Sequence, residues 1–349
     1  MNDVRTVGAL RDLGTRLLAA SGVPQDRAAR TAEILVLAES WGVGSHGLMR
    51  LPHYLSRLQA GGHDPAADLE TAQDSGPVVS LRGHAGLGHW QAWSAAELAT
   101  ERARRYGIAA VTVADSGHCG ALGAYVLPGL EAGLLTIVVS NGPPAMAPWG
   151  SATAELSTSP IAAGVPCRPR PMILDMALSN VARGKIAARA RTGEPLPDGW
   201  ALDADGRPTT DATVALRGLL APLGGAKGFA LALLVESLTG GVVGPALSRD
   251  VSDMFADDHV ARPQRIAHTV ITLDPTRLDP DGGDGARSRL DALSRNVTDA
   301  GARLPGAARR LPAEIRDDEP IVLDPGLDRE LAGWAARLLT VSTTIEGTA

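Results

Sequence analysis

A serine, a histidine and an arginine with catalytic chemistry stand together in the short segment Gly44–Arg50. The imidazole of His46 can gain and lose a proton near neutral pH. The guanidinium of Arg50 carries a fork of N–H groups that matches a carboxylate, and Ser45 adds a hydroxyl beside the imidazole. The segment therefore predicts a loop that binds a carboxylate group and passes a proton to or from the bound molecule, while an ordinary surface loop stays open as the alternative.

A second histidine, His118, follows the expected strand Ile108–Val113. Ligand sites of α/β proteins favour the carboxyl ends of strands, and the flanking Gly117 and Gly120 allow close backbone approach there. A plain turn remains the alternative. Cys119 is not expected to act as a nucleophile with His118, because neighbours in sequence seldom face each other productively.

The chain has two lysines, Lys185 and Lys227, and both adjoin glycine, a setting suited to phosphate contact. The run Gly224–Gly228 precedes a helix expected from Phe229, whose N-terminus would attract an anion. A tight turn without a ligand stays possible. Neither the G-x-G-x-x-G fingerprint between a strand and a helix nor a P-loop is present in the sequence.

Composition excludes several classes of protein. The 349 residues are 44% hydrophobic and 21% charged, which indicates a globular chain of one large or two smaller domains. A net charge of -6 argues against a nucleic acid partner. Glu236 and several glycines interrupt the apolar stretch Phe229–Leu247, so we expect a buried helix rather than a membrane span. The start of the chain, residues 1–20, carries Asp3 and Asp12 and no continuous apolar run, so we expect no signal peptide and a cytoplasmic location. Cys119 and Cys167 suit neither a disulfide framework nor a zinc site, and we expect no metal.

Alternating helix and strand patterns predict an α/β fold with a mixed sheet behind an N-terminal helical segment. Helical spacing predicts one helix that ends near Ser21, a second from Pro24 to Trp41 and a third from Pro52. The further expected strands are Val78–Leu81, Ile108–Val113, Leu134–Val139, Met172–Met176 and Ile266–Leu273. The further expected helices are Trp90–Tyr106, one from Val181, Phe229–Leu238, Arg287–Leu293 and Leu327–Leu339, with a hairpin at Asp205-Gly206.

In their order along the chain, these motifs resemble the malate/L-lactate dehydrogenase family of the second type. That family also holds ureidoglycolate and sulfolactate dehydrogenases, diketogulonate reductase and cyclic imino acid reductases. The resemblance is colinear over most of the chain. It is carried by Ser45–Gly47, Arg50–Pro52, Tyr54, Gly117–Gly120, Ser157–Pro160, Leu174–Ser179, Ala182–Lys185, Pro197–Asp203, Thr209–Asp211, Leu223–Gly228 and Leu304–Gly306.

The resemblance implies an NAD(P)-dependent oxidoreductase with a non-Rossmann nucleotide-binding domain, a small carboxylate substrate and a homodimeric assembly. It implies that His46 is the proton donor, with Ser45 beside it and Asp175 as a relay partner. His118 is the rival acid. Arg50 would bind the substrate carboxylate, and the substrate side would also include Tyr54 and Thr158. The cofactor contacts that it implies are Leu174, Asp175, Met176, Ala177, Leu178, Ser179, Asn180, Lys185, Ala226, Lys227, Pro305 and Gly306.

The chain departs from the family pattern at three places. The family's Thr-Asn-Pro is Thr158-Ser159-Pro160 here, and its Ser-x-His-Phe-Gly ends in His118-Cys119-Gly120. Both segments belong to the expected substrate side, so the substrate need not be malate or lactate. The family's Pro-Gly-Glu is Pro305-Gly306-Ala307, which weakens the C-terminal cofactor assignment.

We expect residues 1–75 to form the helical segment with the Ser-His-Gly loop. Residues 76–115 and 260–349 would form the main α/β domain, and residues 116–259 the NAD(P)-binding domain. The expected reaction interconverts a 2-oxo acid and a 2-hydroxy acid, with NADH and NADPH both open. Two alternatives stand beside it: reduction of a cyclic imine carboxylate of the pyrroline or piperideine type, and a nucleotide-binding scaffold without catalysis.

Overall fold

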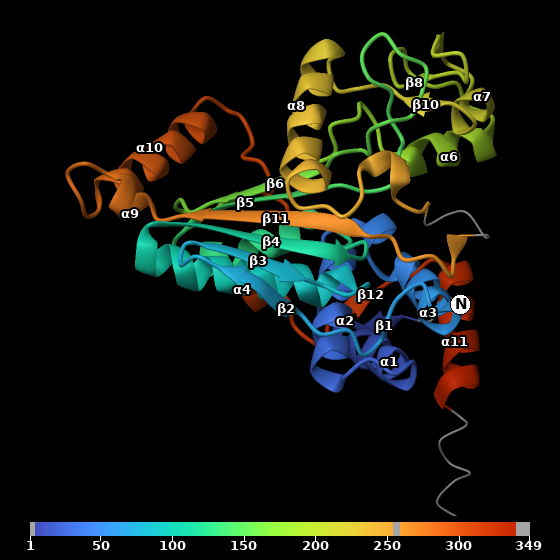
Figure 1. The fold of residues 1–349 in the computed structure, drawn as a ribbon, viewed down its shortest axis with the longest axis horizontal. Coiled ribbons are helices and arrows are strands. Elements are labelled where there is room, and N and C mark those ends of the chain that lie inside the picture. The colour runs from blue at the N-terminus through green and yellow to red at the C-terminus, as the bar shows by residue number, and fades with distance from the viewer. Residues whose placement is uncertain (1–3, 254–258, 340–349) are drawn as a thin grey trace, which may run out of the picture.

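The computed structural model describes residues 4–253 and 259–339, so residues 1–3, 254–258 and 340–349 of the predicted segments lie outside it. Within the described residues, seven strands form one sheet in the order β2-β3-β4-β11-β5-β6-β7 (Figure 1). Only the β3–β4 pair is parallel there, and the other neighbours are antiparallel, so the prediction of a mixed sheet is confirmed. The strands are β2 Glu70–Asp74, β3 Val78–Arg82, β4 Ile108–Ser116, β5 Leu135–Ser140, β6 Ile161–Val165, β7 Met172–Met176 and β11 Ile266–Leu273.

The central strand of the sheet, β11, comes late in the chain and separates β4 from β5. Its Val270 stands opposite Val111 on one side and Val138 on the other, and all three side chains are fully buried. Strands β5, β6 and β7 come from the predicted nucleotide-binding segment and continue the sheet that β2, β3 and β4 begin (Figure 1). One hydrophobic core therefore extends beneath both parts of the sheet.

Helix α4 Gly88–Tyr106 packs against β4 and β11. Its buried residues include five alanines, Ala92, Ala95, Ala96, Ala99 and Ala103, whose small side chains let the helix axis approach the strands closely. The helix ends at Gly107, whose positive φ of 87° forms the left-handed cap. Figure 1 shows α4 on one face of the sheet, with α10 Gly285–Asp299 and α8 Ala226–Glu236 on the opposite side.

The predicted N-terminal helices are present as α1 Val7–Ala20, α2 Gln25–Ser40 and α3 Leu51–Ala60. The C-terminal helix α11 Pro325–Leu339 packs with them, and Leu10, Leu51 and Leu331 are fully buried in their shared core. The short strands β1 Arg5–Thr6 and β12 Pro320–Ile321 pair beside these helices. This bundle fixes the direction in which the loop between α2 and α3 faces.

A smaller lobe lies beyond β7. It holds α6 Arg183–Thr192 and α7 Ala212–Leu216, together with the sheet β8 Ala201–Leu202, β9 Pro208–Thr209 and β10 Leu219–Leu220. Antiparallel pairing of β8 with β9 confirms the predicted hairpin. The remaining short helices are α5 Leu127–Glu131 and α9 Pro275–Leu278.

The apolar stretch from Phe229 was predicted to be a buried helix, and this prediction was wrong for one side of the helix. Ala232 and Val235 of α8 are buried in the core of the smaller lobe, but Leu231 and Leu234 are 51% and 54% exposed. The sequence is apolar around the whole helix, so it carries no pattern that distinguishes the covered side from the open side. Among the described residues, none of the helices combines the length and apolarity that crossing a membrane requires.

Candidate active site

The Ser-His-Gly loop leaves α2 and enters α3 through two turns of 3-10 helix, Gly44–His46 and Leu48–Arg50. The Nε–H of Arg50 donates to the carbonyl of Ser45 at 2.7 Å. The hydroxyl of Ser45 lies 3.0 Å from Nδ1 of His46. The three predicted residues therefore share one folded unit, in which the arginine is held against the segment that carries the histidine.

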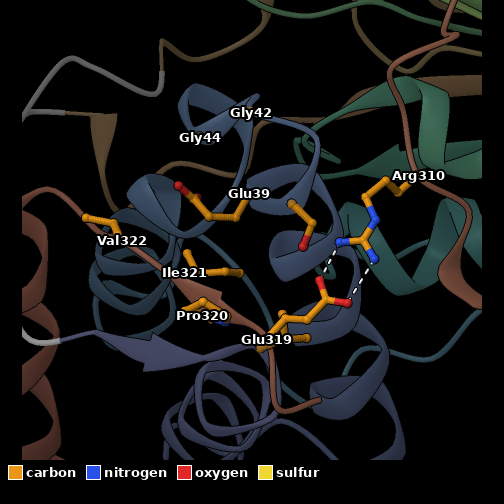
Figure 2. A pocket seen from close by; sticks show the side chains of 10 residues that line it. Glu39, Gly42, Gly44, Arg310, Glu319, Pro320, Ile321 and Val322 are labelled. Carbon is orange, nitrogen blue, oxygen red and sulfur yellow. Dashed lines mark hydrogen bonds and ion pairs between the residues drawn. The ribbon is translucent and has the colours of Figure 1, made fainter. Parts of the chain in front are cut away.

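Glu39, which sequence reasoning missed, anchors this loop from behind. Its Oε2 accepts a hydrogen bond from the N–H of Leu48 at 3.1 Å. A Cβ on Gly47 would stand 2.6 Å from the same oxygen and 3.0 Å from the backbone carbonyl oxygen of Leu35, so the close packing favours glycine there. Burial raises the pKa of Glu39, and the Leu48 N–H partly opposes that shift. Figure 2 shows Glu39 in the wall of a pocket of about 360 Å³ beside Gly44.

His118 contacts Tyr54, which comes from the first turn of α3 after the Ser-His-Gly loop. The phenol oxygen lies 2.6 Å from Nδ1 of His118, and the N–H of Gly120 lies 3.3 Å from the same nitrogen. A backbone N–H can only donate, so Nδ1 is the acceptor and the ring proton is on Nε2. Burial raises the pKa of Tyr54, which keeps the phenol protonated as a donor.

Both histidines belong to one site, since the rings of His46 and His118 stack with their centroids 6.0 Å apart. Burial lowers the pKa of His118 well below its usual value, and the neighbouring His46, His89 and Arg50 lower it further. His118 is therefore a neutral imidazole at physiological pH. Its Nε2–H can donate a hydrogen bond, but Nδ1 is engaged and cannot take up a proton.

Two polar residues near the start of β11 hold the His118 loop, and sequence reasoning missed both. Oε1 of Gln264 accepts the N–H of His118 at 2.9 Å, and Nε2 of His268 lies 3.1 Å from the carbonyl of Gly117. The carbonyl of Gly117 can only accept, which assigns a proton to Nε2 of His268, and the hydroxyl of Ser140 lies 2.9 Å from Nδ1 of the same ring. A histidine within the predicted strand Ile266–Leu273 was the available signal.

The pKa of His46 is lowered by burial and then by Arg50, whereas the negative charge of Asp175 raises it. Asp175 lies on β7, and its carboxylate forms an ion pair of 3.1 Å with Arg309. Asp175 thus acts on His46 through its charge, and its direct partner is the arginine. The predicted site residues Ser45, His46, Arg50, Tyr54, His118 and Asp175 lie around one centre.

The predicted cofactor segments converge on the end of β7. Leu178 donates its N–H to Thr158 at 2.8 Å and accepts the N–H of Leu223 at 2.8 Å. Asn180 accepts the N–H of Gly224 through its side chain at 3.2 Å. The run Leu174–Asn180 therefore lies between the Thr158 segment and the glycine turn that opens α8. Met176 and Asn180 are exposed there, Ala177 is half-buried, and Leu178 and Ser179 are buried.

The Pro305-Gly306 turn reaches the same strand from the C-terminal region. The N–H of Ile173 donates to the carbonyl of Pro305 at 3.0 Å. Gly306 has a φ of 73°, and a Cβ there would stand 2.5 Å from the carbonyl of Ile173, so the close contact requires glycine. Lys185 lies in the first turn of α6, exposed and at the border of this group.

The residues at the N-terminus of α8 fit the phosphates of a nicotinamide dinucleotide. The first N–H groups of a helix lack partners within the helix and attract anions. Gly224 and Gly225, with φ of 60° and 71°, form the turn before them, and Ala226 and Lys227 are exposed in the first helical turn. Because β5, β6 and β7 are antiparallel, this surface differs from the parallel sheet of the Rossmann fold.

Comparison with known proteins identifies this arrangement. The family model of malate/L-lactate dehydrogenase matches residues 6–331. The chain belongs to the malate/L-lactate dehydrogenase family. Like the other members it is an oxidoreductase of the nicotinamide-dependent type, a dehydrogenase or reductase. The sequence-based assignment of the family and of the fold is thereby confirmed.

Relatives within the family differ in their substrates. The chain is 39% identical to the (2R)-3-sulfolactate dehydrogenase (NADP(+)) of Chromohalobacter salexigens, covering 93% of this chain and 95% of that protein. It is 32% identical to the Delta(1)-pyrroline-2-carboxylate/Delta(1)-piperideine-2-carboxylate reductase of Pseudomonas aeruginosa, covering 93% and 97%. Among solved structures, the sulfolactate dehydrogenase of Methanocaldococcus jannaschii matches with a TM-score of 0.88 and 29% identity, covering 96% and 97%.

Proposed function

We propose that this family member interconverts a 2-oxo acid and a 2-hydroxy acid, with His46 as the residue that gives and takes the proton. The observation that carries the assignment is the state of the rival histidine. Nδ1 of His118 accepts hydrogen bonds from Tyr54 and Gly120, and Nε2 already bears the ring proton. His118 can therefore orient a substrate oxygen, which leaves His46 as the proton carrier.

The other groups have distinct parts in the proposed reaction. Arg50 would bind the substrate carboxylate. Its Nε–H donates to the carbonyl of Ser45, and this contact fixes the orientation of the whole guanidinium group. Ser45 beside Nδ1 of His46 would set the orientation of the imidazole. Tyr54 and Thr158 would line the substrate side. When bound, the reduced cofactor supplies the hydride, and His46 supplies the proton that the new hydroxyl group needs.

The cofactor would lie along β7 and the start of α8. Lys227, Ala226 and the first N–H groups of α8 would hold its phosphates, with Lys185 nearby and Pro305-Gly306 at the far end of the run Leu174–Asn180. The convergence of these segments through backbone hydrogen bonds supports this proposal. It also supports residues 116–259 as the nucleotide-binding segment, next to the helical segment 1–75 and the main α/β parts 76–115 and 260–349.

Reduction of a cyclic imine carboxylate is the second candidate. Burial and Arg50 lower the pKa of His46, so its imidazole is largely neutral at pH 7. A protonated imine brings the proton that its product needs, and it would depend less on His46 as an acid. The relatives are named for sulfolactate, malate, pyrroline-2-carboxylate and piperideine-2-carboxylate, so these compounds and their oxo acid partners are the first substrates to compare.

The test is oxidation of NADH and NADPH by the purified protein with 2-oxo acids and cyclic imine carboxylates, over a range of pH. We expect 2-oxo acid reduction to fall as the pH rises through the pKa of His46, which lies below 6.5. We expect His46→Ala to lose about 100-fold or more in turnover with nucleotide affinity near that of the wild type. Full activity of His46→Ala on a 2-oxo acid would reject the assignment, and turnover of imines alone would select the second candidate.

We also propose a homodimer in which the open side of α8 is covered by a second copy. Exposed apolar patches of this kind mark protein interfaces. Leu231, Leu234 and Val242 supply the patch, and Val242 is 78% exposed. A cytoplasmic location is proposed with it, because the nicotinamide cofactor is available there, and cell fractionation would test that location.

A further inference from the structure

Arg309 lies at the edge of the active site although no motif pointed to it. Its Nη1 is 3.1 Å from Oδ2 of Asp175, and the two side chains are only 17% and 13% exposed. It stands three residues beyond Gly306, in the segment that the Pro305-Gly306 turn directs along β7. An ion pair that is mostly shielded from water is screened less than a surface pair and acts more strongly on its neighbours.

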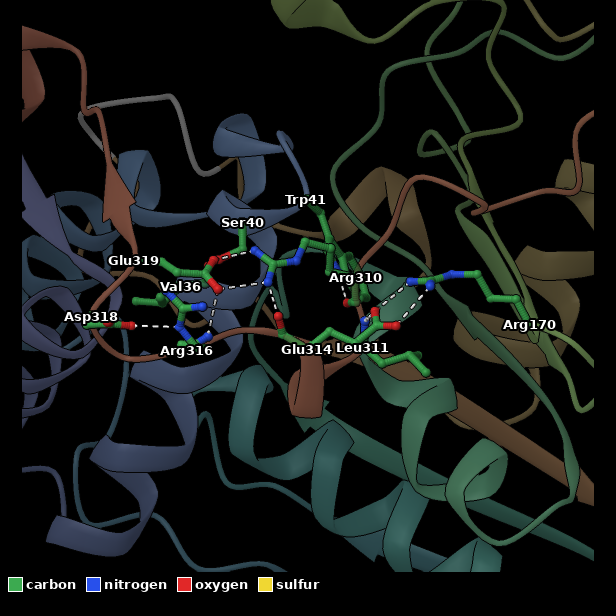
Figure 3. A network of polar contacts seen from close by, with 10 residues as sticks. All are labelled: Val36, Ser40, Trp41, Arg170, Arg310, Leu311, Glu314, Arg316, Asp318 and Glu319. Atoms are coloured by element: carbon green, nitrogen blue, oxygen red, sulfur yellow. Dashed lines mark hydrogen bonds and ion pairs between the residues drawn. The ribbon is translucent and has the colours of Figure 1, made fainter.

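The segment that carries Arg309 is held from several sides. Nη2 of Arg170 donates to the carbonyl of Arg309 at 2.7 Å, and Nε1 of Trp41 donates to the carbonyl of Arg310 at 2.7 Å. Arg170 is itself held by both carboxylate oxygens of Glu314, at 2.9 and 2.6 Å (Figure 3). The guanidinium of Arg309 lies over the ring of Trp41, 5.0 Å from its centroid.

Gly123 leaves the space that the ion pair occupies. A Cβ at this position would overlap Nη1 of Arg309 and would stand 3.0 Å from Oδ2 of Asp175. The φ of Gly123 is not in the left-handed region, so backbone conformation does not require glycine there. The requirement comes instead from the close approach of Arg309 and Asp175.

The charges around His46 come from four elements. Arg50 lies on its own loop, His118 follows β4, Asp175 is on β7, and Glu39 at the end of α2 lies behind the loop. The carboxylate of Asp175 favours the protonated imidazole, and Arg50 opposes it. Arg309 is the direct partner of that carboxylate.

We propose that Arg309 is a positioning residue, which fixes the Asp175 carboxylate relative to His46, offsets part of its charge and so sets the pH at which His46 changes protonation. The proposal rests on the proposed role of His46 as the proton carrier. Removing the positive charge should leave the full charge of Asp175 to act on His46. The protonated imidazole then becomes more stable, and the midpoint for its loss of a proton moves to higher pH.

The first readout is independent of turnover. The ring signals of the histidines are followed by nuclear magnetic resonance during a pH titration, and the His46 signal is assigned by its absence in His46→Ala. For Arg309→Gln we expect the His46 midpoint to rise by about half a unit or more. For Asp175→Asn it should fall. Combining both changes should give a midpoint between those of the two single variants, because the opposite charges of Arg309 and Asp175 act on His46 in opposite directions.

Two further variants serve as controls. Arg309→Lys keeps the charge and should keep the midpoint near that of the wild type. Arg316→Gln removes an equal charge from an exposed position of the same C-terminal region and should leave the midpoint and the kinetics unchanged. If Arg309→Gln does not fold, the Gly123→Ala variant tests the same pair, since its methyl group meets both Arg309 and Asp175 and forces the pair to rearrange, and the His46 midpoint should then differ from that of the wild type.

The outcomes separate this proposal from the proposed function. An unmoved or lowered His46 midpoint in a folded Arg309→Gln would overturn the role of Arg309. The pH profile of turnover is the second readout, and it should move with the His46 signal. If the signal moves and the profile does not, Arg309 acts on His46 as proposed and His46 as the proton carrier is rejected.

Discussion

The phenol oxygen of Tyr54 and Nδ1 of His118 are 2.6 Å apart, which links the helix after the Ser-His-Gly loop to the loop after β4. Sixty-four positions separate the two residues in sequence. Together with the Gly120 N–H, this contact selects the ring form of His118 that presents Nε2–H. The position of His118 is thus controlled by the helix that follows the loop of His46.

Tyr54→Phe should lower kcat/KM about tenfold while the protein stays folded, because His118 loses a donor that fixes its ring. The free energy of unfolding should fall by about 1 kcal/mol for the lost buried hydrogen bond. Steady-state kinetics and urea denaturation measure the two effects. Tyr106→Phe changes an exposed phenol at the end of α4 and is the matched control. Unchanged kcat/KM in Tyr54→Phe would show that the contact does not serve the reaction.

Arg50→Lys should raise the KM for the carboxylate substrate about tenfold or more, with a smaller effect on nucleotide affinity. Lysine keeps the charge but loses the Nε–H that donates to Ser45 and the fork that orients a carboxylate. Initial rates with the best substrate give KM, and fluorescence titration gives nucleotide affinity. Arg82→Lys, at an exposed position on β3, controls for the exchange itself. An equal KM in Arg50→Lys and wild type would exclude Arg50 as the carboxylate ligand.

Glu39→Ala should lower kcat/KM, because the N–H of Leu48 loses its acceptor and the loop behind His46 loosens. Glu39→Gln retains an acceptor and should keep most of the activity. Kinetics of the pair separate the hydrogen bond from the charge. Equal losses in both variants would mean that the charge of Glu39, and not its hydrogen bond, matters for the loop.

Glu39 also predicts how stability depends on pH. Burial raises its pKa in the folded protein, so the folded state binds this proton more tightly than the unfolded state. The stabilisation that protonated Glu39 provides is fully present below the pKa of 4.5 that the residue has in the unfolded chain. It is lost as the pH rises through the higher pKa that the residue has in the folded protein. The free energy of unfolding of Glu39→Gln relative to wild type should therefore increase from pH 4.5 to pH 7. Denaturant unfolding at several pH values measures it, and a constant difference would contradict the assignment.

Leu234→Asp should dissociate the proposed dimer, because a carboxylate on the open side of α8 would be buried without a partner in the interface. Light scattering after size-exclusion chromatography measures the molar mass. Leu278→Asp changes an equally exposed leucine on α9 and should leave the mass unchanged. A wild-type protein that elutes as a monomer, or a Leu234→Asp variant that stays a dimer, would reject this surface.

Sequence patterns predicted the strands with continuous apolar runs, because burial on both faces requires such runs. They missed β2 Glu70–Asp74, whose polar residues are all exposed at the edge of the sheet, and β6 Ile161–Val165, whose small residues resemble a loop after Pro160. The exposed side of α8 was missed for the opposite reason, since its leucines resemble core residues.

The candidate site shows the same division between local and distant information. Ser45, His46 and Arg50 have reactive side chains and lie within one short loop, so their closeness in the sequence was enough to find them. Glu39 and Arg309 act through partners that only the fold brings close. Single acidic and basic residues carry no local pattern, so a sequence without its fold gives no reason to choose them from the others.

The place of β11 between β4 and β5 has a consequence for synthesis of the chain. Both neighbours are made well before Ile266–Leu273, and until that strand arrives each presents an unpaired edge to other chains. Pairing over such sequence separations is slow and leaves the nascent chain open to aggregation. Nascent chains that end before Ile266 should therefore be the species most prone to aggregation, and chaperone binding should matter most for them.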